Sequence, residues 1–248
     1  MMKATLAFIF LACMLSSFMS VMASDYTLDI FGNSNMDDAV DEKDIDYLKG
    51  IIEGKNQPTE LADANYNGKI DEDDIHQIEQ IIAKEEKELT LKDSVERIVT
   101  VKKPANRIVL THPHMLETLR TLHVPTKSIV GIAHDKYDLS FFPEFNDAPS
   151  IGWRWTPNVE EIIKLRPDVV ILYGKGGNQG NLDQVQNVME SSNITVLRFN
   201  CNNVDTYADE IMKLGYVFDK QKEAEEFLDW REDILNLNFA HIGNKKLF

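Results

Sequence analysis

The stretch from Asn158 to Leu172, NVEEIIKLRPDVVIL, is the feature that most constrains the fold of this chain. Its apolar residues recur at near-helical spacing, and its two acids stand in the first turn, where the helix macrodipole favours negative charge. Pro167 cannot continue a helix and favours extended geometry at Arg166, so we expect the helix to end there. The apolar run 169–172 that follows predicts a strand buried on both faces. The stretch therefore indicates one helix-to-strand step of an α/β sheet.

Charge and the N-terminal segment restrict where the protein works. The chain has 248 residues and a formal net charge of -15, which argues against a nucleic-acid partner. Lys3 precedes a largely apolar run that ends in Val21-Met22-Ala23, so we expect residues 1–23 to be a cleaved export signal. The run is also long enough to remain as an uncleaved membrane anchor. We therefore expect an exported protein at the cell surface or in the periplasm.

Residues 26–86 contain a duplicated unit with a period of 30 residues. The copies match position by position: Val40 recurs as Ile70, Asp41 as Asp71, Asp44 as Asp74 and Leu48 as Ile78. Each copy consists of an oxygen-rich loop followed by an amphipathic helix, so the unit predicts a small helical domain built around two loops.

Both loops have the ligand spacing of a calcium-binding EF-hand. The expected calcium ligands of the second loop are Asp63, Asn65, Asn67, Asp71 and Asp74, with the backbone carbonyl of Lys69. Those of the first loop are Asn33, Asn35, Asp37, Asp41 and Asp44, with the carbonyl of Ala39. Gly68 supplies the sharp turn of the second loop. Asp38 replaces it in the first, where we expect left-handed geometry at some cost and weaker calcium binding. The alternative is a pair of acidic, solvated turns.

Two such loops, each followed by one helix and ending in Asp rather than Glu, resemble a dockerin over residues 26–86. The resemblance implies a small all-α domain that folds on calcium and binds a cohesin module of a partner protein. The positions that would face this partner are Glu42-Lys43 and Glu72-Asp73, where dockerins often have small hydroxyl residues. Calcium is therefore the expected cofactor, whereas a cohesin-like partner stays open.

The rest of the chain, residues 89–248, alternates between strand and helix patterns. It opens with an expected hairpin, Leu89 to Val101, that turns in the polar segment 92–96. The expected strands are then 107–110, 128–132, 169–172 and 195–199, and the expected helices are 115–122, 159–165, 182–189 and a long region, 205–237. Strict alternation implies a parallel sheet with helices on both faces, and ligands on such sheets lie beyond the carboxyl ends of the strands.

Several aromatic, basic and histidine residues follow those strand ends. They are His112, His114, Tyr137, Trp153, Arg154, Trp155 and Lys175. Two indoles beside a guanidinium suit a flat or anionic organic ligand, and the histidines could ligate a metal. The alternatives are ordinary surface positions for the histidines and a packing role for one tryptophan. The sequence pairs no nucleophile with a base and contains no phosphate loop, so we do not expect an enzyme.

Residues 89–248 resemble the first lobe of the substrate-binding proteins of ABC importers for iron-siderophore complexes, haem and cobalamin, the Fe/B12 periplasmic-binding family. The motifs that carry the resemblance are PANRIVL, THPHMLETLRTL, SIVGI and IGWRWTPNVEEIIKLRPDVVIL, in the order of the family. The resemblance implies a class III periplasmic-binding fold that holds a metal chelate between two lobes joined by one long rigid helix, here 205–237. It also implies an ABC permease that docks on Glu160. Glu96 and His123 stand where the family usually has glycine.

The region after the long helix reads GNKKLF, where the second lobe of the family would begin. We therefore expect a truncated product that binds its chelate weakly or not at all. Two functions remain. The first is the solute-binding component of a metal-chelate importer with a calcium-binding dockerin-like module. The second is a calcium-dependent interaction or structural protein in which the lobe is a remnant.

Overall fold

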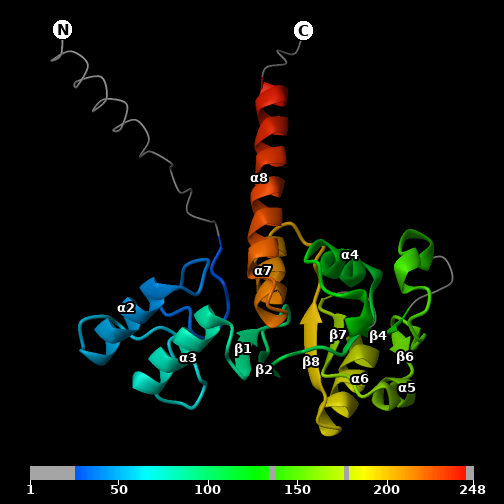
Figure 1. Ribbon diagram of the computed structural model, residues 1–248, viewed down its shortest axis with the longest axis horizontal. Coiled ribbons are helices and arrows are strands. Elements are labelled where there is room, and N and C mark those ends of the chain that lie inside the picture. The colour runs from blue at the N-terminus through cyan, green and yellow to red at the C-terminus, as the bar shows by residue number, and fades with distance from the viewer. Residues whose placement is uncertain (1–25, 134–137, 176–178, 244–248) are drawn as a thin grey trace.

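The computed structural model describes residues 26–133, 138–175 and 179–243, and Figure 1 shows how its elements are arranged. The predicted export signal lies outside the described residues. In the part of the chain that is described, none of the helices combines the length and the apolar character needed to cross a membrane.

The first described part contains two helices, α2 (Glu42–Ile52) and α3 (Glu72–Ala83), which pack against each other. Each helix begins with a capping box, in which the N-cap aspartate and the aspartate three residues later accept each other's backbone N–H groups. These aspartates are the acids at positions 9 and 12 of the two predicted calcium loops. The loop acids therefore also define where the helices start.

The hairpin that follows has the expected form, with β1 (Glu88–Lys92) antiparallel to β2 (Ile98–Lys102). Glu96, in its turn, has a φ of 65°, which is the left-handed conformation that glycine adopts most easily. His123, which follows α4 (Pro113–Thr121), has a φ of 54°. Both residues that replace a glycine of the family thus keep a glycine-like backbone.

The central sheet has four parallel strands in the order β4-β3-β7-β8. The strands are β3 (Ile108–Leu110), β4 (Ile129–Ile132), β7 (Val169–Tyr173) and β8 (Thr195–Phe199). Helices α4, α5 (Val159–Leu165) and α6 (Gln179–Ser191) connect successive strands. The predicted α/β fold class with a parallel sheet is confirmed.

Alternate residues of β7 face two different cores. Val170 and Leu172 pack in a cluster with residues of α5 and α6, whereas Val169 and Ile171 pack in a cluster with residues of α4 and α7 (Tyr207–Val217). Helices on both sides of the sheet therefore bury both faces of this strand, as its apolar run predicted.

Shorter elements complete the sheet region. They are three 3₁₀ helices, Thr126–Ser128, Asp138–Phe141 and Pro143–Phe145, and two two-residue strands, β5 (Gly152–Trp153) and β6 (Thr156–Pro157). Together, β5 and β6 form a small antiparallel ladder just before α5.

Two local expectations were wrong. Arg166 is left-handed, with a φ of 47°, rather than extended, because its N–H closes the last turn of α5 on the carbonyl of Ile163. The region 205–237 is two helices, α7 and α8 (Gln221–Gly243), rather than one. Asp219 breaks it with a φ of 58°, so the rigid connecting helix of the family corresponds at most to α8.

The helical pair and the sheet share one hydrophobic core. Ile30 forms an antiparallel bridge with Leu91, and the N–H of Phe31 donates to the carbonyl of Thr90 at 2.9 Å. The shared cluster includes Leu28, Leu48 and Ile78 from one side and Leu89, Ile108 and Ile211 from the other. Helix α8 joins this core near its start through Ala224, and its later turns project away from the rest of the molecule (Figure 1).

Candidate functional site

Two aromatic side chains meet at the carboxyl ends of β3 and β7. His112 follows β3 and caps the N-terminus of α4, and Tyr173 is the last residue of β7. Their rings stack with 4.7 Å between centroids and 30° between planes. Because these two strands are neighbours in the sheet, residues 61 positions apart lie at one edge.

His114 and Trp155 extend this pair into a cluster of four rings. The His114 ring stacks on His112 at 4.6 Å. Trp155 lies edge-on to His112 at 6.2 Å and to Tyr173 at 5.6 Å. We call these four residues the aromatic cluster. Three of them are predicted ligand residues, whereas Tyr173 was not predicted, although its place at the end of a buried strand was the available signal.

The hydrogen bonding of His112 favours stacking over metal ligation. Its Nδ1 accepts the backbone N–H of His114 at 3.4 Å, so the proton of a neutral ring resides on Nε2. Ligation of a metal by Nε2 would require loss of this hydrogen bond, because the ring would then carry its proton on Nδ1. Within the described ranges, moreover, no group of three or more His, Cys, Asp or Glu side chains is placed to hold a metal ion.

The other predicted ligand residues lie outside the ring cluster. Trp153, in β5, is 52% exposed, and Lys175 is exposed with its ammonium 3.9 Å from the carboxylate of Glu96. Arg154 is half-buried next to Trp155 in the chain, and Tyr137 lies outside the described residues. This edge of the sheet thus combines stacked rings with basic residues that neighbour them in sequence.

A buried arginine holds the chain segment that follows β7. The Arg198 guanidinium donates to the carbonyl oxygens of Tyr173 at 2.8 Å and Gly174 at 3.0 Å, and Arg198 is only 1% exposed. It also donates to three side chains of α6, those of Gln179, Asp183 and Gln186. A planar guanidinium suits such a set of fixed acceptors. Arg198 was not predicted, and its signal was an arginine within the otherwise apolar strand β8.

The predicted docking acid, Glu160, is exposed in the first turn of α5. Asn158 caps this helix, since its side chain accepts the N–H of Glu161 at 3.2 Å. The N–H of Asn158 donates to the carbonyl of Ile151. The N–H of Ile151 in turn donates to the carbonyl of Ile132, the last residue of β4. The start of α5 therefore lies at the carboxyl edge of the sheet, the edge that carries the aromatic cluster.

The two predicted calcium loops, residues 33–44 (loop 1) and 63–74 (loop 2), repeat the same hydrogen bonds. At the end of loop 2, Asp74 accepts two backbone N–H groups of its own loop at 3.1 and 2.9 Å. At the end of loop 1, Asp44 accepts the equivalent groups at 3.0 and 2.8 Å. The sequence repeat is therefore also a repeat of backbone geometry.

The loops differ at the turn position. Gly68 has a φ of 88°, as expected for a sharp turn. Asp38, at the same position of loop 1, does not have a positive φ, so the expected left-handed geometry of Asp38 was wrong. In loop 1, the buried side-chain amide of Asn33 donates to the carbonyl of Asp37 within the loop at 2.6 Å and to the carbonyl of Leu28 before the loop at 2.9 Å.

The oxygen atoms of the loops suit a hard cation. Asp44 and Asp74 are buried, and burial raises the pKa of Asp44 to about 6 and also raises the pKa of Asp74. A bound cation would stabilise their charged forms. Because the described acids form no cluster of three, calcium would also depend on amide and backbone oxygens, which are usual ligands for this ion.

Solved structures of binding proteins are similar to this chain, whereas no curated protein sequence matches it. The molybdate periplasmic binding protein MolA of Haemophilus influenzae is 21% identical with a TM-score of 0.53, and the match covers 63% of this chain and 54% of that one. The petrobactin-binding protein YclQ of Bacillus subtilis is 17% identical with a TM-score of 0.52, covering 65% and 56%. The siderophore-binding protein BauB is 19% identical with a TM-score of 0.52, covering 64% and 55%.

These similarities show a shared fold, and the chain spans about half the length of the three structures. The family described as periplasmic binding protein matches residues 108–235, from the start of β3 into α8, which is just over half of the chain. The matched range contains the whole parallel sheet and the aromatic cluster. The chain therefore belongs to the periplasmic binding protein family.

Proposed function

We propose that the protein is an extracytoplasmic solute-binding component of an ABC importer for a metal chelate such as an iron-siderophore complex, haem or cobalamin. The observation that carries the proposal is the aromatic cluster at the carboxyl edge of the sheet, in a member of a binding-protein family. The similar structures support it, since MolA was solved with molybdate and BauB with acinetobactin and ferric iron.

The chemistry of this edge favours a flat, anionic ligand. The stacked rings of His112, Tyr173 and Trp155 offer an aromatic surface, and Lys175 adds a positive charge that is accessible to solvent. A chelated metal arrives with its own ligands, so the protein does not need a cluster of metal-binding side chains.

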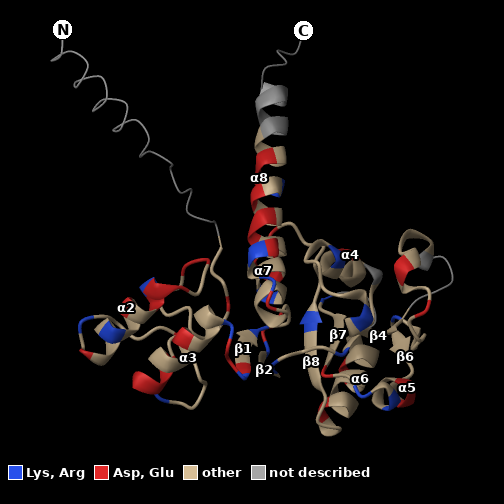
Figure 2. Cartoon of the chain, in the orientation of Figure 1, with Lys and Arg blue, Asp and Glu red and all other residues tan. Residues whose placement is uncertain are grey.

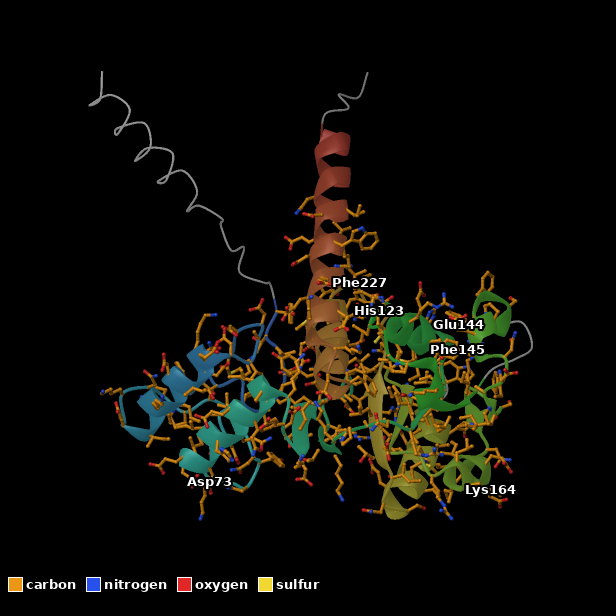
Figure 3. The ribbon with its side chains drawn as sticks, viewed as in Figure 1. Asp73, His123, Glu144, Phe145, Lys164 and Phe227 are labelled. Carbon is orange, nitrogen blue, oxygen red and sulfur yellow. The ribbon has the colours of Figure 1, made fainter. Side chains whose placement is uncertain are left out.

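Glu160 is the proposed contact for an ABC permease. It is exposed at the start of α5, at the same edge as the ligand surface. We expect Glu160→Ala to weaken permease binding in a pull-down while leaving chelate binding unchanged. Lys164→Ala, at the other end of α5 (Figure 3), is the matched control.

The second part of the proposal is that loops 1 and 2 bind calcium and form a dockerin-like module. The repeated hydrogen bonds of Asp44 and Asp74 support it. Acidic residues are prominent on α2 and α3 (Figure 2), and Asp73 points away from α3 into solvent (Figure 3). A cohesin-like partner would use this exposed side. A calcium-dependent interaction protein is therefore the second candidate function.

Calorimetric titration with calcium and with four candidate ligands separates the two functions. The probes are an iron(III)-catecholate complex, haem, cobalamin and molybdate, each added to the calcium-loaded and the EDTA-treated protein. We expect saturable binding of at least one flat anionic chelate, with a Kd weaker than about 1 μM because one face supplies few contacts. Calcium binding without any chelate binding would favour the interaction protein, and submicromolar chelate binding would contradict the expected weakness.

A further inference from the structure

A tyrosine of the sheet region bonds to the backbone of loop 1. The N–H of Val40 donates to the hydroxyl of Tyr216, in α7, at 3.0 Å, and that hydroxyl lies 3.5 Å from the carbonyl oxygen of Val40, to which it donates. Tyr216 is 5% exposed, and its burial raises the pKa of the hydroxyl. The hydroxyl therefore stays protonated and can donate and accept at once.

This contact fixes the orientation of a predicted calcium ligand. The N–H of Val40 and the carbonyl of Ala39 belong to the same planar peptide unit, in which the two groups point in opposite directions. Holding the N–H towards Tyr216 therefore turns the Ala39 carbonyl away from α7. The next peptide unit is held as well, since the Val40 carbonyl contacts Tyr216 while the N–H of Asp41 donates to Asp44 at 2.8 Å.

Loop 2 lacks an equivalent contact. Its residue at the same position, Ile70, has no hydrogen bond to the sheet region among the described residues. Loop 2 has Gly68 with a φ of 88° at its turn, whereas Asp38 in loop 1 does not adopt that conformation. Both loops hold this turn locally, since the N–H of Ala39 donates to Asp37 at 3.0 Å and the N–H of Lys69 donates to Asn67 at 2.9 Å, but only loop 1 adds the contact with Tyr216.

Tyr216 itself is firmly placed against the N-terminal part. Its carbonyl accepts from the ammonium of Lys103 at 2.7 Å, and Lys103 also pairs with the buried Glu86. One turn earlier in α7, the buried Lys213 pairs with Asp209 at 2.6 Å and reaches Asp29 at 3.5 Å. The hydroxyl therefore cannot withdraw from loop 1 without breaking several buried contacts.

We propose that Tyr216 is a positioning residue for calcium in loop 1, which aims the Ala39 carbonyl in place of the missing turn glycine. The inference rests on the proposed calcium binding of the two loops. Loop 1 is then a site completed by the periplasmic-binding part of the chain, whereas loop 2 is complete within the helical pair.

The test is a calcium titration of Tyr216→Phe followed by two-dimensional NMR on the full chain. The substitution keeps the buried ring and removes only the hydroxyl. The amide of Val40 reports on loop 1, and the amide of Gly68 reports on loop 2. We expect the calcium affinity of loop 1 to fall about fivefold, the effect of losing one neutral hydrogen bond, while that of loop 2 changes less than twofold.

Tyr207→Phe is the matched control. Tyr207 lies in the same helix and packs on Phe227, and its hydroxyl has no hydrogen bond within the described ranges. This variant should leave both loops unchanged. Thermal unfolding in EDTA measures any general loss of stability, which would weaken both loops together.

The outcomes are distinguishable. If neither loop of the unmodified protein responds to calcium, the proposed calcium binding fails and the role of Tyr216 fails with it. If both loops bind calcium but Tyr216→Phe leaves loop 1 unchanged, or weakens both loops equally, only the positioning role is overturned.

Discussion

The calcium loops and the aromatic cluster build binding surfaces in opposite ways. The oxygen atoms of loop 2 come from one segment, 63–74, and hydrogen bonds within that segment set their geometry. The rings of the aromatic cluster come from positions between 112 and 173, and a residue outside the cluster, Arg198, holds the end of β7. A site built from one segment thus depends on the spacing of its residues along the chain. A site assembled from several segments also depends on residues that need not touch its ligand. Loop 1 lies between these cases, because Tyr216 completes it.

The largest effect should come from the residue that holds the assembled site. Arg198→Met leaves the carbonyls of Tyr173 and Gly174 without their donor, so we expect the free energy of unfolding to fall by about 4 kcal/mol. Arg107 also donates to backbone carbonyls but is exposed, and Arg107→Met should cost about 1 kcal/mol. Urea unfolding measures both variants. If Arg198→Met lowers the free energy of unfolding no more than Arg107→Met does, then Arg198 does not hold the end of β7 as described.

A smaller loss should follow from breaking loop 1 locally. Asp44→Ala leaves two backbone N–H groups of the loop without an acceptor, which should lower the free energy of unfolding by about 2 kcal/mol in EDTA. Asp46→Ala, an exposed acid of the same helix, should change it by less than about 0.5 kcal/mol. Similar losses for the two variants would show that the Asp44 bonds do not stabilise the loop.

Substitutions at the turn positions of the two loops should change the stability of the protein differently. Gly68→Ala forces a side chain into a positive φ with open space around it, at a cost of about 1 kcal/mol. Asp38→Gly should not stabilise loop 1, because Asp38 needs no left-handed freedom, and added flexibility of the unfolded chain should cost about 0.5 kcal/mol. A gain in stability from Asp38→Gly, seen by thermal unfolding, would contradict this comparison.

The smallest effect should come from the charge beside the aromatic cluster. Lys175 is exposed, so Lys175→Ala should weaken binding of an anionic chelate by only about threefold, and less at high salt. Lys127→Ala is the control, because Lys127 is an exposed charge at the amino end of β4, away from the carboxyl edge of the sheet. This variant should leave the affinity for the chelate unchanged. Calorimetry at two salt concentrations tests this, and equal effects of both variants would argue against a contact by Lys175.

The contrast between the two surfaces also explains what the sequence could predict. Most element bounds follow from spacing along the chain, and β8 agrees with its prediction residue by residue. Tyr173 and Arg198 could not be recognised in this way, because their roles depend on which strands and helices become neighbours. The break at Asp219 could not be recognised either, because the carboxylate of Asp219 pairs with Lys103, from a distant part of the chain, at 2.5 Å. Local patterns therefore predict secondary-structure elements well and assembled sites only in part.

The most direct test of the proposed ligand surface is tryptophan fluorescence during titration with an iron(III)-catecholate complex. Trp155 belongs to the aromatic cluster, whereas Trp230 lies in α8 and is 57% exposed. We predict saturable quenching of the unmodified protein and of Trp230→Phe, and loss of most of that quenching in Trp155→Phe. Undiminished quenching in Trp155→Phe would contradict a ligand surface formed by the aromatic cluster, because Trp153 and Trp230 lie outside that cluster.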